Sequence, residues 1–109
     1  MNPLLRQSAT TLARRIREGE LRSVDVVRAH IHRIREVNPT LNLVVRDRFD
    51  AALDEARAAD ERLDREGPDG LPPFHGVPCT IKESFALTGM PHTAGLVSRE
   101  GVVATGDAT

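Results

Sequence analysis

Residues 73–83 read PFHGVPCTIKE, and this stretch decides how the rest of the chain is interpreted. Residues 77–81 are a short run of β-favouring side chains, and the run ends at Lys82. In α/β proteins, catalytic groups collect at the carboxyl ends of strands. A lysine held in a dry site loses the solvation of its charge, so its neutral amine becomes available as a base. Lys82 is therefore the candidate catalytic residue; the alternative is a lysine that only extends its ammonium into solvent.

The sequence before this stretch predicts three helices. Ser8 can cap a first helix, which is expected to end at Gly19. A second helix begins at Ser23 and is expected to end at the Asn-Pro pair of residues 38–39. A third helix starts at residue 47, where the apolar side chains take up helical spacing, and stops at the Gly-Pro pair that follows residue 66.

Two short strands complete the expected order of elements. Residues 41–45 alternate apolar and polar side chains apart from one extra valine, which is typical of a strand with both faces at least partly covered. With residues 77–81 as the second strand, the order is helix, helix, strand, helix, strand. The predicted fold class is therefore α/β, and residues 102–103 are expected to add one more extended piece.

Composition excludes several classes of function. The 109 residues suit a single domain, whose core must rest on aliphatic side chains because the chain has three Phe and neither Trp nor Tyr. Fifteen basic and sixteen acidic residues give a net charge of −1, so no overall field favours nucleic acid. Cys79 is the only cysteine, which excludes an internal disulfide and a cysteine-based zinc site and favours the cytoplasm. No membrane-spanning segment, metal or cofactor is predicted.

Five blocks of sequence together resemble the amidase-signature enzymes. They are residues 73–83 (PFHGVPCTIKE), 89–95 (GMPHTAG), 107–109 (DAT), 23–27 (SVDVV) and 38–42 (NPTLN). Residues 85–91 (FALTGMP) are most similar to the fatty-acid amide hydrolases of that family. The resemblance implies that residues 1–109 are the N-terminal part of a single amidase domain, in an α/β/α fold with a mixed central sheet. It also implies that the substrate is a small-molecule carboxylic amide.

The resemblance gives Lys82 a defined role. In the family, the matching lysine acts through a second serine in a cis peptide and so activates a nucleophilic serine, in a Ser-cisSer-Lys mechanism. The Gly/Ser-rich motif that carries both serines has no counterpart here. Ser84 and Ser98 are interpreted as loop residues, because neither lies in a Gly-Ser-Ser-Gly or G-x-S-x-G context. The chain is thus expected to be truncated before the serine motif and inactive alone.

The other reactive side chains near Lys82 receive structural interpretations. Cys79 lies inside the predicted strand, where a buried and inert thiol is expected. His75 and His92 are expected to pack or to belong to loops. His30 and His32 are two positions apart on a helix and so point in different directions, which argues against a shared metal.

Two further interpretations stay open. The first is the amidase component of a tRNA-dependent amidotransferase, which would release ammonia from glutamine for a partner. The second is a non-catalytic helical interaction fragment, in which one of two apolar stripes binds another chain. The stripes consist of Val24, Val27, Ile31 and Ile34, and of Phe49 and Leu53. A homodimer is also left open.

Overall fold

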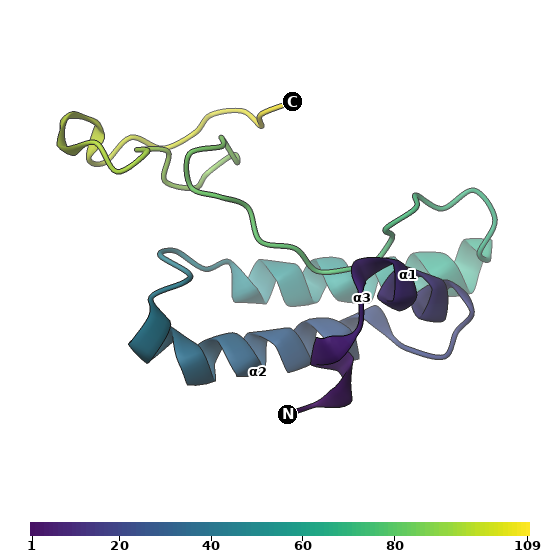
Figure 1. Cartoon of the computed structure of the whole chain (residues 1–109). Coiled ribbons are helices and arrows are strands. Elements are labelled where there is room, and N and C mark those ends of the chain that lie inside the picture. Colours follow the sequence, from purple (N-terminus) through teal and green to yellow (C-terminus); the bar gives the residue numbers. More distant parts are fainter. The chain divides into compact units, whose positions relative to one another are not determined.

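The computed structural model describes all 109 residues, and its regular elements are helices (Figure 1). They are η1 (Pro3–Arg6), α1 (Ala9–Arg17), α2 (Ser23–Leu41), α3 (Phe49–Glu66) and η2 (Val97–Arg99), where η denotes a 3₁₀ helix. The chain forms two compact units. The first contains residues 1–43 and 48–78, and the second contains residues 44–47 and 79–109.

Helix α1 confirms the sequence-based prediction at both ends. Ser8 is its N-cap, and the Ser8 hydroxyl accepts a hydrogen bond from the amide of Thr11 at 3.2 Å. Gly19 follows the C-terminal end with φ at +75°, a conformation that glycine adopts without a steric penalty. Leu12 and Ile16 are buried on the inner face, as their spacing predicts.

Helix α2 begins at Ser23 as predicted, but the prediction that residues 38–39 end it is wrong. Pro39 lies inside the last turn, and the helix continues to Leu41. The stop is instead Asn42, which adopts a left-handed conformation with φ at 50° and donates its amide to the Asn38 carbonyl at 2.8 Å. Asparagine tolerates this conformation and closes helices in the way that glycine does, so Asn42 overrides the weaker signal from proline.

The two predicted strands, at residues 41–45 and 77–81, do not form. Leu41 belongs to α2, and residues 77–81 are extended chain without a strand neighbour. A strand needs hydrogen bonds to a second strand, and alternation of side chains cannot supply that partner. The only β-type pairing is an antiparallel bridge between Pro91 and Val103, so the extended piece predicted at residues 102–103 is present as one bridge.

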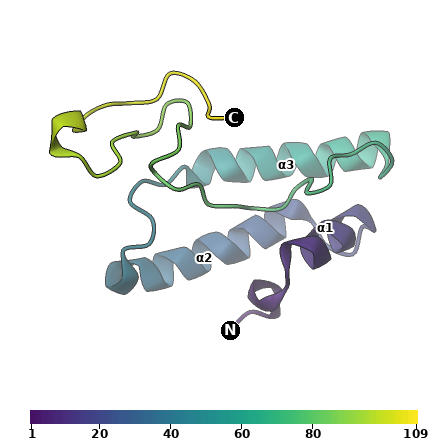
Figure 2. The ribbon, with the colours of Figure 1, turned by 45° about the horizontal axis from the view of Figure 1, so that its top comes forward.

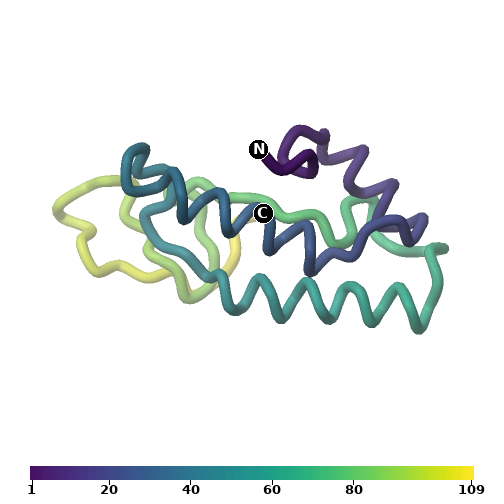
Figure 3. The backbone as a smooth tube through the Cα atoms, turned by 90° about the horizontal axis from the view of Figure 1, so that it is seen from below, coloured from purple at the N-terminus to yellow at the C-terminus, as the bar shows by residue number.

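Helices α2 and α3 form an antiparallel pair that carries the core of the first unit (Figures 2 and 3). One buried cluster joins α1, α2, α3 and the segment after α3, and the other lies between α2 and α3 alone. The two apolar stripes considered as partner-binding faces therefore cover each other, and this packing counts against an interaction fragment. The clusters are Leu12, Ile16, Val26, Leu63 and Leu71, and Val27, Ile31 and Ala56 with the half-buried Val24, Phe49, Ala52 and Leu53.

The second unit is an irregular loop that is pinned by backbone hydrogen bonds. Gly89 donates to the Ala104 carbonyl at 2.8 Å, and Ala104 donates to the Met90 carbonyl at 3.0 Å. His92 donates to the Val102 carbonyl at 2.9 Å. Residues 89–92 and 102–104 thus run side by side like the stem of a hairpin, and Ala104 is the one buried side chain of this unit.

The segment around Lys82 as a candidate active site

The stretch that leads toward Lys82 is anchored in the first unit. The ring Nε2 of His75 donates to the Ala59 carbonyl at 2.8 Å, and the hydroxyl of Ser23 donates to the Gly76 carbonyl at 2.6 Å. The guanidinium of Arg17 donates to the Pro72 carbonyl at 3.0 Å. The packing role expected of His75 is confirmed. These bonds fix residues 72–76 against α1, α2 and α3 and so fix the start of the 77–82 run.

Gly76 is required at its position for two reasons. Its φ of +77° is unfavourable for any residue with a side chain, and an added Cβ would lie 3.0 Å from the Cβ and the hydroxyl oxygen of Ser23. We expect Gly76→Ala to lower the free energy of unfolding by about 2 kcal/mol, measured by urea denaturation.

Gly70→Ala is the matched control for this substitution. Gly70 has almost the same φ of +78°, but an added Cβ would meet nothing within 4 Å. Gly70→Ala therefore measures only the penalty of placing a side chain at a positive φ. Equal losses for the two variants would show that crowding of the added Cβ by Ser23 adds no penalty.

Lys82 itself lies in a turn and is exposed. Its carbonyl accepts the amide of Phe85 at 2.9 Å, which closes the turn. The side chain makes no hydrogen bond or ion pair, so its amine is unoccupied. Lys82 is also the only lysine in the chain, the other basic side chains being arginines and histidines. Because arginine keeps its proton in proteins, Lys82 is the one strongly basic side chain here that can act as a neutral amine.

Glu83, the next residue, holds a distant turn. Its carboxylate accepts hydrogen bonds from the Thr93 hydroxyl at 2.6 Å, from the Thr93 amide, and from the Ala94 amide at 3.2 Å. The hydroxyl of Thr93, followed by the amides of Thr93 and Ala94, keeps the pKa of Glu83 below its usual value. Sequence reasoning missed this carboxylate, because its partners lie ten and eleven positions further along the chain.

Asp107 makes a similar connection at the end of the chain. Its Oδ1 accepts the amide and the hydroxyl of Thr88, each at 2.8 Å, and Ala108 donates to the Ala86 carbonyl at 2.9 Å. Glu83 thus contacts the block at residues 89–95, and residues 107–108 contact the block at residues 85–91.

The other side chains singled out near Lys82 do not join it in a catalytic group. His92 donates from Nε2 to the Ser84 carbonyl at 3.1 Å, and Ser98 lies in η2. Cys79 is exposed, so the prediction of a buried thiol is wrong. The reason is that no neighbouring strand covers residues 77–81. His30 is hydrogen-bonded to the Val26 carbonyl at 2.8 Å.

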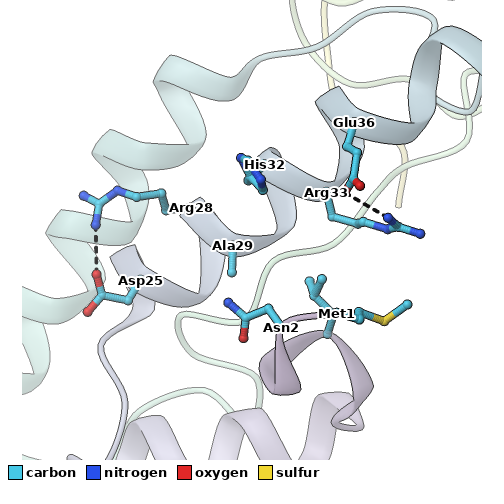
Figure 4. Close-up of a pocket in the computed structure, with 9 residues that line it drawn as sticks. Met1, Asn2, Asp25, Arg28, Ala29, His32, Arg33 and Glu36 are labelled. Atoms are coloured by element: carbon cyan, nitrogen blue, oxygen red, sulfur yellow. Dashed lines mark hydrogen bonds and ion pairs between the residues drawn. The ribbon is translucent and has the colours of Figure 1, made fainter.

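A hollow of about 600 Å³ lies elsewhere, between η1 and α2 (Figure 4). Its charges are already paired across one turn of α2. Asp25 lies 2.9 Å from Arg28, and Glu36 lies 2.8 Å from Arg33. None of the residues around Lys82 lines it, so the hollow does not extend the candidate site.

Comparison with known proteins identifies the family. The family model described as Amidase matches residues 25–109, which is most of the chain. The chain belongs to the amidase family. This match confirms the resemblance drawn from the sequence blocks, and it covers every block from Asp25 onward, including Lys82 and Glu83.

Relatives of this amidase chain include named hydrolases. Fatty-acid amide hydrolase 2-A of Danio rerio is 52% identical over 112 residues, which is 98% of this chain and 21% of the relative. Fatty-acid amide hydrolase 2 of Homo sapiens is 44% identical over the same shares. A glutamyl-tRNA(Gln) amidotransferase subunit of Acidothermus cellulolyticus is 38% identical over all of this chain and 21% of its own length. The chain thus spans about a fifth of the length of these curated relatives. None of its helices combines the length and apolar character needed to cross a bilayer.

Proposed function

We propose that residues 1–109 are the lysine-bearing, N-terminal part of an amidase that hydrolyses carboxylic amide C–N bonds. The observation that carries the proposal is the free amine of Lys82 within blocks that the family model matches and that hydrogen bonds bring together. The identity of 52% to a fatty-acid amide hydrolase favours fatty-acid amides as the substrate class. In the complete domain, residues 41–45 and 77–81 would become strands of a mixed central sheet.

The proposed chemistry follows the Ser-cisSer-Lys relay. The neutral amine of Lys82 accepts a proton by way of a bridging serine, and the nucleophilic serine oxygen forms a bond to the amide carbonyl carbon. The C–N bond then breaks, and the relay returns the proton to the departing nitrogen. Water hydrolyses the resulting ester and frees the serine. Neither serine has a counterpart among residues 1–109, so the chain alone is proposed to be inactive.

The proposal is tested with a chimera in which residues 1–109 replace the matching fifth of the Danio rerio enzyme. Identity of 52% over this segment makes such an exchange practicable. The chimera is expected to release ammonia from a fatty-acid primary amide, whereas the 109-residue chain alone releases none. A chimera with native far-UV circular dichroism and no amide hydrolysis would contradict the proposal.

A second function is favoured by a different relative. The whole chain matches the amidotransferase protein of Acidothermus cellulolyticus at 38% identity. Residues 1–109 grafted into that protein, and assayed for glutamine hydrolysis with the other components of its complex, test this function. Activity in this graft together with none in the fatty-acid amide hydrolase chimera would favour the amidotransferase.

The proposed setting is the cytoplasm, with a small-molecule amide and no nucleic acid as partner. An exposed free thiol at Cys79 suits a reducing compartment, and the near-neutral net charge offers no field for a polyanion. A homodimer is the proposed alternative to a monomer, and sedimentation equilibrium distinguishes the two.

A further inference from the structure

The turn at residues 93–95 has an unusual backbone. Ala94 has φ at 51° and Gly95 has φ at 73°, so two consecutive residues lie in the left-handed region. Alanine rarely adopts this conformation, and it persists only where the surrounding structure imposes it. The carboxylate of Glu83 supplies that constraint, because it accepts the amides of both Thr93 and Ala94.

The same carboxylate is only one residue from Lys82. The Lys82–Phe85 turn is tied to residues 92–95 at two points, by the Glu83 carboxylate and by the bond from His92 to the Ser84 carbonyl. Arg99 in turn donates to the His92 carbonyl at 2.8 Å. These bonds hold the backbone on the C-terminal side of Lys82 and leave its amine unpaired, which is the arrangement that a base requires.

We infer that Glu83 is a positioning residue, whose carboxylate fixes the backbone of Lys82 by holding the Thr93–Ala94 turn. The inference rests on the proposed function, since positioning Lys82 matters only if Lys82 is the base. The alternative is that Glu83 stabilises the loop as a whole and has no particular effect at Lys82. The two roles differ in where the backbone loosens when the carboxylate is removed.

Acidification provides the first test. The hydrogen bonds to Glu83 keep its folded pKa below the unfolded value, so they are present above the unfolded pKa and are lost as pH falls through the folded pKa. His92 is the titratable group that faces this carboxylate, and Arg99 is the charged group beyond it. The amide protons of Thr93 and Ala94 are therefore expected to shift together with the Glu83 carboxyl carbon in an NMR titration.

The variant Glu83→Gln provides the second test, in the 109-residue chain. Because Lys82 is the only lysine, selective ¹⁵N labelling of lysine assigns its single backbone signal, and the order parameters of Lys82 and Ala104 are then measured in uniformly ¹⁵N-labelled protein. Glu83→Gln is expected to abolish the titration of the two amides and to lower the order parameter of Lys82 by more than that of Ala104. Glu83→Asp, which retains the charge, is expected to restore part of the Lys82 value. The exposed Glu100→Gln is the matched control and should change neither signal.

Either of two results would overturn the inference. One is the absence of a shared titration between Glu83 and the amides of Thr93 and Ala94. The other is an unchanged Lys82 order parameter, or an equal loss at Lys82 and Ala104, in Glu83→Gln. Neither readout depends on catalysis. An inactive chimera would therefore refute the proposed function without changing either NMR result, and a failed titration would overturn the inference without bearing on the proposed function.

Discussion

Replacing Asp60 with alanine is expected to lower the free energy of unfolding by about 3 kcal/mol. Asp60 projects from α3, is only 3% exposed, and accepts the amides of Ser23 at 2.7 Å and Val24 at 3.1 Å. These amides open α2 and have no partner within their own helix. Alanine would leave both without an acceptor, at a point where Ser23 is almost fully buried.

Asp64 supplies the control for Asp60. It lies one turn further along α3 and is exposed. Its carboxylate accepts hydrogen bonds from both terminal guanidinium nitrogens of Arg22, at 2.7 and 2.8 Å. Asp64→Ala is expected to cost less than about 1 kcal/mol, because exposed ion pairs contribute little. Urea unfolding followed by circular dichroism measures both. An Asp60→Ala loss no larger than the Asp64→Ala loss would show that Asp60 does not cap α2.

The helices were predictable because their determinants are local. Ser8, Gly19 and the spacing of Leu12 and Ile16 define α1 without reference to any other segment. The end of α2 was missed because a proline in the last turn of a helix is tolerated when an asparagine three residues later closes it.

The strands were not predictable from residues 41–45 and 77–81 alone. A strand is stabilised by a neighbour, and the one β-bridge of the structure, between Pro91 and Val103, involves neither stretch. Four apolar side chains of these stretches consequently stay more than half exposed: Leu41, Leu43, Val45 and Ile81. Their exposure agrees with the proposal that the two stretches form strands, and bury these side chains, only within a complete amidase domain.

The candidate site was predictable in part. Motif resemblance singled out Lys82, but local pattern does not reveal the hydrogen bonds that join distant positions of the chain. Asp60 caps a helix 37 positions earlier, and Asp107 holds Thr88 from 19 positions away. Ser23 is the first residue of α2, yet its hydroxyl donates to the Gly76 carbonyl and not to its own helix.

Replacing Lys82 with alanine in the chimera is expected to lower kcat about a thousandfold, with KM nearly unchanged. The amine is the proton acceptor of the proposed relay, and no other side chain of this chain can replace it as a neutral strong base. Lys82→Arg is expected to fail equally, because a guanidinium keeps its positive charge and does not release its proton. If Lys82 acted only in folding or as a positive charge, Lys82→Arg would instead retain most of the kcat.

The most direct test of the proposed mechanism is the kcat of fatty-acid amide hydrolysis by three folded chimeras, carrying Lys82, Lys82→Ala and Lys82→Arg. The mechanism predicts an active first protein and two variants that are each slower by about a thousandfold. Either variant retaining kcat to within about threefold of the parent would contradict it, because general-base catalysis by Lys82 could not then contribute its expected share.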